Sequence, residues 1–225
     1  MSGEIDTRSR NFEVCVLGSR KLRENDRIML LLARDFGRLD AVVPGVRRPG
    51  SRFAGAFEPF TFLKGSFYRR LGGELWTVKE AEVQVRPPSS EDWRMPVVMQ
   101  SAGELIYHAG PHEGMEKATY PLAATFRREL GYAREPWTPL LAFYISWSSQ
   151  AGFGLPDAPL KSGAANFISR VTHDDPANWR RYRLSAPTRD ALFAVCIAHA
   201  EEHTEKKWTG LRMLRDSFRA KEISR

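Results

Sequence analysis

The sequence predicts an α+β protein of two domains, a small five-stranded β-barrel followed by an α-helical domain. Five short segments between residues 12 and 85 either alternate apolar and polar residues or run apolar, as β-strands do. Pro87 and Pro88 then interrupt this pattern, and beyond them apolar residues recur at helical spacing. The chain has 225 residues, of which 42% are hydrophobic, so it is long enough to form two compact cores.

The first strand is indicated by Phe12, Val14 and Val16, which alternate with more polar neighbours. The other four are expected at Ile28–Ala33, Leu39–Val43, Phe60–Tyr68 and Glu74–Val85. The second is a continuous apolar run, which fits a strand covered on both faces. Residues 45–52 are rich in glycine, proline and arginine and predict an exposed loop. Five short strands in this span are typical of an OB-type barrel.

Helical spacing begins after the segment Arg86–Ser90, which marks the expected domain boundary. We therefore expect a barrel domain at residues 1–86 and a helical domain at 91–225. Residues 153–184 lack clear periodicity and are expected to be irregular. The expected helices are marked by stripes or caps at Val98–Ala109, Thr119–Leu130, Thr138–Ala151, Pro187–His199 and Leu211–Phe218.

Several classes of protein are disfavoured by what the sequence lacks. No window approaches the run of about 18 apolar residues that crosses a membrane, and the first eleven residues do not resemble a signal peptide. The only two cysteines, Cys15 and Cys196, are too few for a disulfide framework. No phosphate-binding loop, serine elbow or dinucleotide fingerprint occurs. We expect a cytoplasmic protein that is not an enzyme and needs no cofactor.

Positive charge is concentrated in the first domain. The formal net charge is +7, and residues 19–70 hold twelve Lys or Arg against five Asp or Glu, which accounts for the whole excess. A localised basic region of this kind favours a polyanionic partner. The candidate phosphate contacts are Arg20, Lys21, Arg23, Arg34, Arg38, Arg47, Arg48, Arg52, Lys64, Arg69 and Arg70.

Aromatic residues near these cations could stack on unpaired bases, which is the usual combination in proteins that bind single strands. The candidates are Phe53, Phe57, Tyr68 and Trp76. The competing interpretation is that the charges form a solvated surface and that the aromatic residues belong to the core.

The sequence His199-Ala200-Glu201-Glu202-His203 matches the H-x-x-E-H pattern of a class of zinc peptidases. Such a site needs a third ligand from farther along the chain, and only 22 residues follow His203. The simpler interpretation is that His199 continues the apolar stripe of its helix while Glu202 faces solvent. We therefore expect no metal at this site, and a zinc hydrolase is the third functional hypothesis.

Several motifs of the first domain resemble, in order and spacing, those of the bacterial RecO recombination mediators. They are Glu24-Asn25-Asp26, Phe36-Gly37-Arg38-Leu39, Val43-Pro44-Gly45-Val46-Arg47-Arg48, Ser51-Arg52, Glu58-Pro59-Phe60 and Leu75-Trp76. The helical part resembles the same family more loosely. The resemblance implies an OB-fold domain followed by a helical domain. Among the basic residues it singles out Arg34, Arg38, Arg47, Arg48 and Arg52 as DNA contacts.

The resemblance further implies a non-enzymatic DNA repair protein, associated with the nucleoid. Such a protein binds single- and double-stranded DNA, anneals complementary strands, and helps to load RecA together with RecR and the single-stranded-DNA-binding protein. Many relatives carry four zinc-binding cysteines in the stretch equivalent to residues 153–184, where this sequence has none. Structural zinc is therefore not expected, and packing by Phe153, Phe167, Trp179 and Tyr182 is expected in its place. An RNA-binding OB module is the alternative function.

The acidic, apolar-ended tail of a single-stranded-DNA-binding protein would need a basic rim beside an apolar pocket. The helical domain offers one group of residues with this chemistry, namely Phe126, Arg127, Arg128, Tyr144 and Trp147. The aromatic members of this group also lie on helical stripes, so a place in the core is the competing interpretation.

Overall fold

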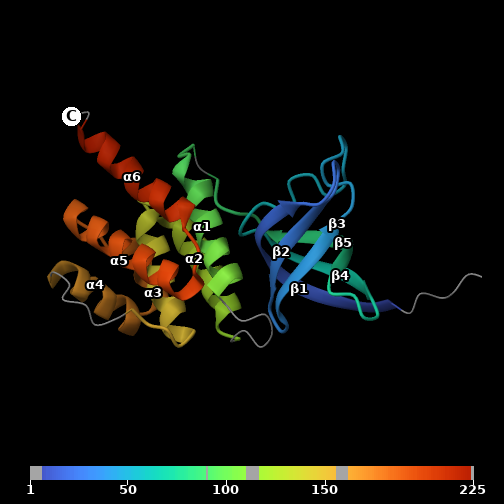
Figure 1. The fold of residues 1–225 in the computed structure, drawn as a ribbon, viewed down its shortest axis with the longest axis horizontal. Helices are drawn as coiled ribbons and strands as arrows, with labels where there is room; N and C mark the ends of the chain where they lie inside the picture. The colour runs from blue at the N-terminus through green and yellow to red at the C-terminus, as the bar shows by residue number, and fades with distance from the viewer. Residues whose placement is uncertain (1–6, 90, 110–116, 156–161, 224–225) are drawn as a thin grey trace, which may run out of the picture. The chain divides into compact units, whose positions relative to one another are not determined.

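The computed structural model describes residues 7–89, 91–109, 117–155 and 162–223. The chain divides into two compact units (Figure 1). Met1–Pro87 and Pro111–Tyr120 form the first, and Pro88–Gly110 and Pro121–Arg225 form the second. The first unit contains all five strands, and the second contains helices. The predicted α+β class with an N-terminal barrel and a helical part is therefore confirmed.

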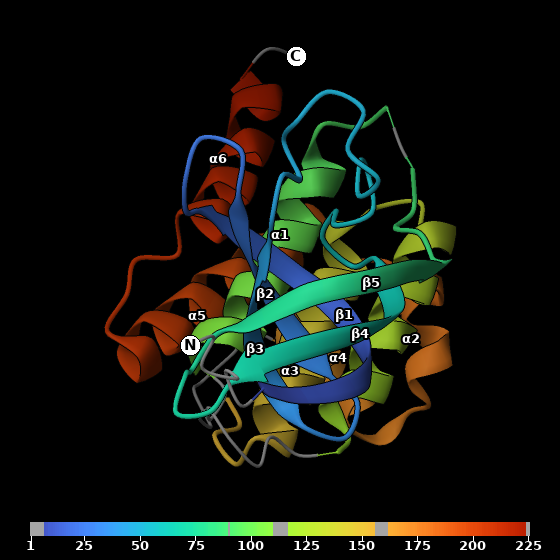
Figure 2. The same cartoon turned by 90° about the vertical axis from the view of Figure 1, so that its right-hand side faces the viewer.

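The five strands close into a barrel in the order β1-β2-β3-β5-β4. Their bounds are β1 (Thr7–Lys21), β2 (Arg27–Ala33), β3 (Gly37–Val43), β4 (Phe62–Arg70) and β5 (Trp76–Val85). The first half of β1 pairs with β4 and its second half with β2, so β4 lies between β1 and β5 (Figure 2). A short parallel pairing of β3 with β5, at Ala41 and Trp76, completes the ring. A five-stranded barrel with this order is the OB-fold that the sequence predicts.

The barrel core is filled by the residues that alternate inward along each strand. Phe12, Val14 and Val16 of β1 meet Leu31 and Leu63 there, all less than 7% exposed. On β2 the residues of the opposite face are apolar too, and Ile28 and Leu32 are also buried. The expectation of a strand covered on both faces is confirmed.

Strand β1 begins at Thr7, five residues before the alternating apolar pattern suggests. Its first residues pair with β4, placing Arg8 opposite Arg69 and Arg10 opposite Phe67. Backbone pairing with a neighbouring strand does not require apolar side chains, so apolar alternation alone misses this extension.

The segment between β3 and β4 holds several residues with left-handed backbone, of which Gly45 and Phe60 bear on the site. Gly45 has φ +65°, which costs glycine little, and it opens the turn that carries Arg47 and Arg48. Phe60 has φ 60°, a strained value for a bulky residue. Its backbone N–H donates to the Val16 carbonyl at 2.7 Å and its side chain is fully buried, which together hold this conformation.

The second unit is built around α3 (Trp137–Gln150), in which every residue from Trp137 to Ser148 is buried. The helices packed with it include α1 (Arg94–Ala109), α4 (Ser162–His173) and α5 (Ala186–Thr204) (Figure 1). Helix α5 begins as a capped helix should, because the Ser185 hydroxyl accepts from the Thr188 backbone N–H. The remaining elements are α2 (Thr119–Tyr132), the 3-10 helix η1 (Pro176–Arg181) and α6 (Thr209–Ile223).

The segment expected to be irregular, residues 153–184, instead contains α4 and η1. Only three residues of α4 are buried, namely Ala164, Phe167 and Val171. Because most of the residues between them are polar, the helical periodicity of this segment is weak in the sequence. Trp179 of η1 is fully buried. Phe167 packs edge-on against Tyr182 with ring centroids 5.6 Å apart.

Candidate nucleic-acid interface

Three connections of the barrel meet around one open groove of about 740 Å³. They are the β1–β2 loop (22–26), the turn after β3 (44–48) and the β4–β5 loop (71–75). We call this feature the loop groove. It is lined by Leu22, Arg23, Asp26, Val42, Pro44, Tyr68, Arg70, Gly73, Glu74, Leu75 and Thr77. Connections of this kind are where OB-folds bind oligonucleotides.

Asp26 ties the first two of these connections together. One of its carboxylate oxygens accepts the Gly45 backbone N–H at 2.8 Å, and its carbonyl accepts the backbone N–H groups of Leu22 and Arg23. A second link runs from the Arg47 N–H to the Asn25 carbonyl at 3.1 Å. These bonds fix the backbone that carries the basic residues, so an acidic residue organises a basic surface.

Five of the predicted cations are exposed around this end of the barrel with their charges unpaired. Within the residues that the structure describes, their side chains have no hydrogen bond or ion pair to another group. They are Lys21, Arg23, Arg47, Arg48 and Arg70. Such side chains can neutralise phosphates without first breaking an internal ion pair.

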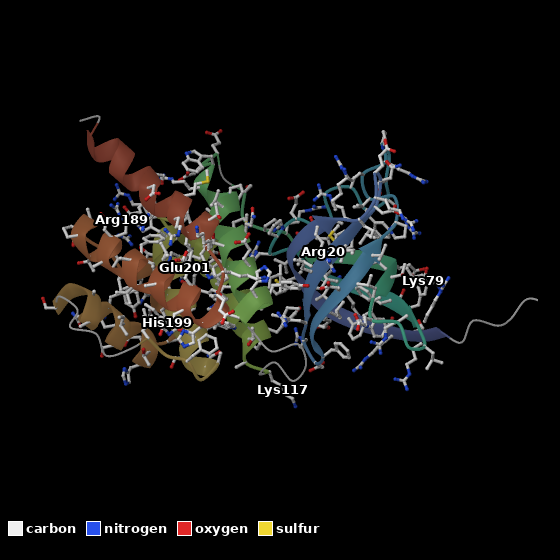
Figure 3. All side chains as sticks on the ribbon, in the orientation of Figure 1. Arg20, Lys79, Lys117, Arg189, His199 and Glu201 are labelled. Atoms are coloured by element: carbon white, nitrogen blue, oxygen red, sulfur yellow. The ribbon has the colours of Figure 1, made fainter. Side chains whose placement is uncertain are left out.

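Other predicted cations are engaged within the barrel unit. Arg20 pairs with Asp40 at 2.9 Å, and Arg34 pairs with Glu13 at 2.8 Å and lies over the Tyr120 ring (Figure 3 labels Arg20). Arg38 is only 8% exposed, so its guanidinium is not displayed on the surface.

Arg52, Lys64 and Arg69 are also constrained. Arg52 donates to the Lys79 carbonyl at 2.7 Å. Lys64 lies between Glu13 and Glu82, its partners on the two neighbouring strands. Arg69 stacks over the Trp76 ring at 4.8 Å.

Tyr68 is the exposed member of the predicted stacking residues. Phe53, Phe57 and Trp76 are at most 8% exposed and belong to the barrel core, as the competing interpretation held. Tyr68 is 39% exposed and lines the loop groove. Exposed leucines accompany it at Leu22, Leu71 and Leu75, so apolar surface lies between the cations.

Arg8 and Arg10 are exposed basic residues of the barrel that the sequence analysis missed, because it placed the start of β1 too late. Arg8 and Arg10 continue the two-residue spacing of Phe12 and Val14 toward the N-terminus. This continued spacing was the signal from which the longer strand could have been predicted.

The aromatic residues expected to receive a partner's tail are not exposed on the surface. Phe126, Tyr144 and Trp147 are at most 2% exposed and lie in the helical core. The helical stripes on which they lie explain this outcome, because such stripes face inward. Arg128 is half exposed and pairs with the buried carboxylate of Glu129 at 3.2 Å.

Of the two histidines in the H-x-x-E-H pattern, His199 is part of the helical packing, whereas His203 is exposed (Figure 3 labels His199). His199 is 4% exposed, and its Nδ1 lies 2.7 Å from the Tyr144 hydroxyl. Burial, with a smaller effect of nearby His203, lowers the pKa of His199 below its ordinary value. Among the described residues, no group of three or more His, Cys, Asp and Glu is placed to hold a metal ion. None of the described helices is long and apolar enough to cross a membrane.

Comparison with known proteins gives a family-model match over the barrel and several similar proteins. Residues 9–85 match the family model for the N-terminal part of recombination protein O. A protein named DNA repair protein RecO from Bifidobacterium adolescentis is 56% identical over 70 residues, covering 31% of this chain and 28% of that protein. One of the same name from Streptomyces griseus is 48% identical over 60 residues, covering 27% of this chain and 24% of the relative.

A longer match is found with the DNA repair protein RecO of Symbiobacterium thermophilum. It is 30% identical over 149 residues, covering 64% of this chain and 56% of the relative. The match therefore spans little more than half the length of that protein. The barrel has the OB-fold and matches the RecO N-terminal model over nearly its whole length, so residues 9–85 form a domain of the kind found at the N-terminus of recombination protein O.

Proposed function

We propose that this protein is a DNA-binding repair protein that binds single strands at the loop groove and promotes their annealing. The observation that carries the proposal is the set of five exposed cations around the loop groove that have no ion pair among the described residues: Lys21, Arg23, Arg47, Arg48 and Arg70. In this proposal residues 1–86 form the DNA-binding domain and residues 91–225 a helical domain that binds partners.

The proposed mechanism has no covalent step. Cations around the loop groove neutralise the phosphates, while Tyr68 and the neighbouring leucines contact unpaired bases. Two strands with neutralised backbones repel each other less, and their own base pairing completes annealing. Arg20 and Arg34 contribute less, because each would have to leave a carboxylate to meet a phosphate. Arg38 is left out because it is buried.

We also propose the partners that the family suggests. They are double-stranded DNA, RecR and the tail of the single-stranded-DNA-binding protein, with RecA loading as the outcome. The support is the match of the barrel to the N-terminal model of recombination protein O and the similarity of the chain to proteins named DNA repair protein RecO. We propose that the tail binds the helical domain, at a surface that does not include Phe126, Tyr144 and Trp147, because these residues are buried.

Deleting the acidic tail of the coat protein should abolish annealing of coated strands and leave annealing of naked strands intact. Equal annealing of strands coated by the tailless protein would contradict docking through the tail.

The direct test measures fluorescence anisotropy of a labelled oligothymidine of about 30 nucleotides. The variant Arg23→Gln/Arg47→Gln/Arg48→Gln should bind at least about 10-fold more weakly, because three phosphate contacts are lost. The matched control Arg20→Gln/Arg34→Gln removes two exposed arginines that are already paired, and we expect a loss within about threefold.

Two further outcomes bear on the proposal. Equal losses in the two variants would show that the loop groove is not the binding site. Tighter binding of an RNA oligonucleotide of the same sequence would favour the alternative, an RNA-binding module.

A further inference from the structure

Three arginines form a second basic group on the barrel, apart from the loop groove. Arg8 and Arg10 extend from β1 in phase with the core residues Phe12 and Val14, and Arg69 extends from β4 in phase with Phe67. Successive side chains of a strand point to opposite faces, so all three lie on the inner face of the sheet where it runs past the packed core.

The guanidinium groups of Arg10 and Arg69 rest on the aromatic residues that close this part of the core. Arg10 lies over the rings of Phe12 and Phe36, at 5.1 Å and 5.5 Å, and Arg69 lies over Trp76 at 4.8 Å. The Phe12 and Trp76 rings meet edge to face with centroids 5.0 Å apart. Stacking occupies the flat face of a guanidinium and leaves the N–H groups of its edge free to donate. A fixed, planar donor edge is suited to a phosphate.

Within the described part of the chain, no carboxylate pairs with the side chains of Arg8, Arg10 and Arg69. Arg8 and Arg69 are moreover direct neighbours across the β1–β4 pair. Like charges placed directly opposite each other destabilise a sheet, and an anion bound between them removes that cost. The arrangement therefore favours an anionic ligand.

This group and the loop groove lie on opposite faces of the β4–β5 hairpin. Tyr68 and Arg70 alternate with Arg69 along β4, and Thr77 follows Trp76 on β5. Tyr68, Arg70 and Thr77 line the loop groove, whereas Arg69 and Trp76 belong to the inner face. One hairpin thus separates two basic surfaces (Figure 2 shows β4 and β5 side by side).

We propose that Arg8, Arg10 and Arg69 form a second binding surface, which takes the phosphates of a second single strand of DNA. This inference rests on the proposed function, because it assigns the first strand to the loop groove. Two strands held on one small domain experience a high effective concentration of each other. Their encounter then no longer depends on free diffusion of two polyanions.

The test uses the full chain and two non-complementary oligothymidines, one labelled with a donor and one with an acceptor fluorophore. Energy transfer reports a second strand bound beside the first, and anisotropy of the donor strand alone reports the first. The variant Arg10→Gln/Arg69→Gln should keep first-strand affinity within about threefold. It should weaken second-strand binding, and slow annealing of complementary strands, by about 10-fold, because two phosphate contacts are lost.

A second variant separates phosphate binding from a structural role. Arg10→Lys/Arg69→Lys loses the planar stacking but keeps both charges, and because phosphate neutralisation depends mainly on charge, it should recover most of the second-strand binding. If stacking on the aromatic rings were the only role, the lysine variant would fail like the glutamine variant and both would unfold at lower urea concentration.

The outcomes distinguish this inference from the proposed function. Wild-type protein that fails to bind oligothymidine would overturn both. Normal wild-type binding, with second-strand binding and annealing unchanged in Arg10→Gln/Arg69→Gln, would overturn the second surface alone. An equal loss of first- and second-strand binding in that variant would also overturn it, because the two groups would then form one footprint.

Discussion

At the residue scale, we expect Asp26 to affect DNA binding in the direction opposite to the one that its charge suggests. Removing a carboxylate beside a polyanion ordinarily raises affinity. The Asp26 side chain, however, holds the turn of Gly45 to the β1–β2 loop through a 2.8 Å hydrogen bond. Asp26→Ala should therefore weaken single-strand binding by about three- to 10-fold, the value of one such bond.

Asp26→Asn is the matched control, because it removes the charge and keeps an oxygen that can accept the Gly45 N–H. Its affinity should equal or exceed that of the wild type, measured by the same anisotropy titration. An increase in affinity for both variants would show that the carboxylate acts only through its charge.

Tyr68 is the residue expected to distinguish single from double strands. Its ring is 39% exposed in the loop groove, and only an unpaired base can stack on it. Tyr68→Ala should lower single-strand affinity by about 10-fold and leave duplex affinity nearly unchanged, whereas Tyr68→Phe keeps the ring and the affinity. Tyr132→Ala, which removes an exposed tyrosine from the helical unit, is the control. Equal losses for single strands and duplex with Tyr68→Ala would exclude stacking.

At the element scale, the β4–β5 hairpin depends on a close approach at Gly65. A Cβ atom at this position would lie 2.4 Å from the Glu80 carbonyl oxygen, inside van der Waals contact with backbone. Gly65→Ala should therefore destabilise the barrel by about 1–3 kcal/mol in urea unfolding. Gly18→Ala is the control, because its new methyl group would meet only the end of Leu30, at 3.8 Å. Equal stability of the two variants would mean that the strands separate at little cost.

The elements themselves were predictable where side-chain pattern and pairing agree. Strands β2 and β3 could be predicted because their runs of apolar residues coincide with the residues that are buried and paired in the sheet. The start of β1 and the whole of α4 were not, because Arg8 and Arg10 lie beyond the core and the α4 stripe is sparse. The basic residues were predictable as a set. Their pairing was not, because it depends on register, which brings Arg20 to Asp40 across three strands.

The packing of α3 against α5 makes the helical unit sensitive to acid. Burial lowers the pKa of His199 below its ordinary value of 6.5, with a smaller contribution from His203, whereas in the unfolded chain the ring keeps that ordinary value. The unfolded state thus binds more protons below pH 6.5, and stability falls as the pH drops from 6.5 toward the lower pKa of the folded state.

The measurement is the urea midpoint between about pH 7.5 and 5.5, where one such group changes stability by at most about 1.4 kcal/mol per pH unit. His199→Gln should flatten this dependence. His173→Gln removes an exposed histidine of α4 and should leave it unchanged. A pH dependence unaltered by His199→Gln would show that other groups cause it.

At the scale of the whole molecule, the charge is divided unevenly along the chain. The net charge of +7 equals the excess of residues 19–70, and Arg8 and Arg10 extend the same basic character to the start of β1. The positive excess therefore belongs to the barrel, and the rest of the chain is close to electrically balanced. Binding to DNA should accordingly be governed by phosphate neutralisation and depend weakly on base sequence.

The salt dependence of single-strand binding tests this at the level of the whole protein. Each phosphate contact on a single strand contributes about −0.7 to the slope of log affinity against log salt concentration. Five cations at the loop groove therefore predict a slope of about −3.5, which is about a 100-fold loss of affinity between about 50 and 200 mM salt. The triple variant of Arg23, Arg47 and Arg48 should have a slope of about −1.4 and lose only about sevenfold in affinity over that range.

The titration is repeated for the Arg20→Gln/Arg34→Gln control, whose slope should stay close to that of the wild type because both arginines are held by carboxylates. A wild-type affinity that is flat across this range would rule out phosphate neutralisation as the source of binding, and identical slopes in the triple variant and the control would place the contacts elsewhere on the molecule.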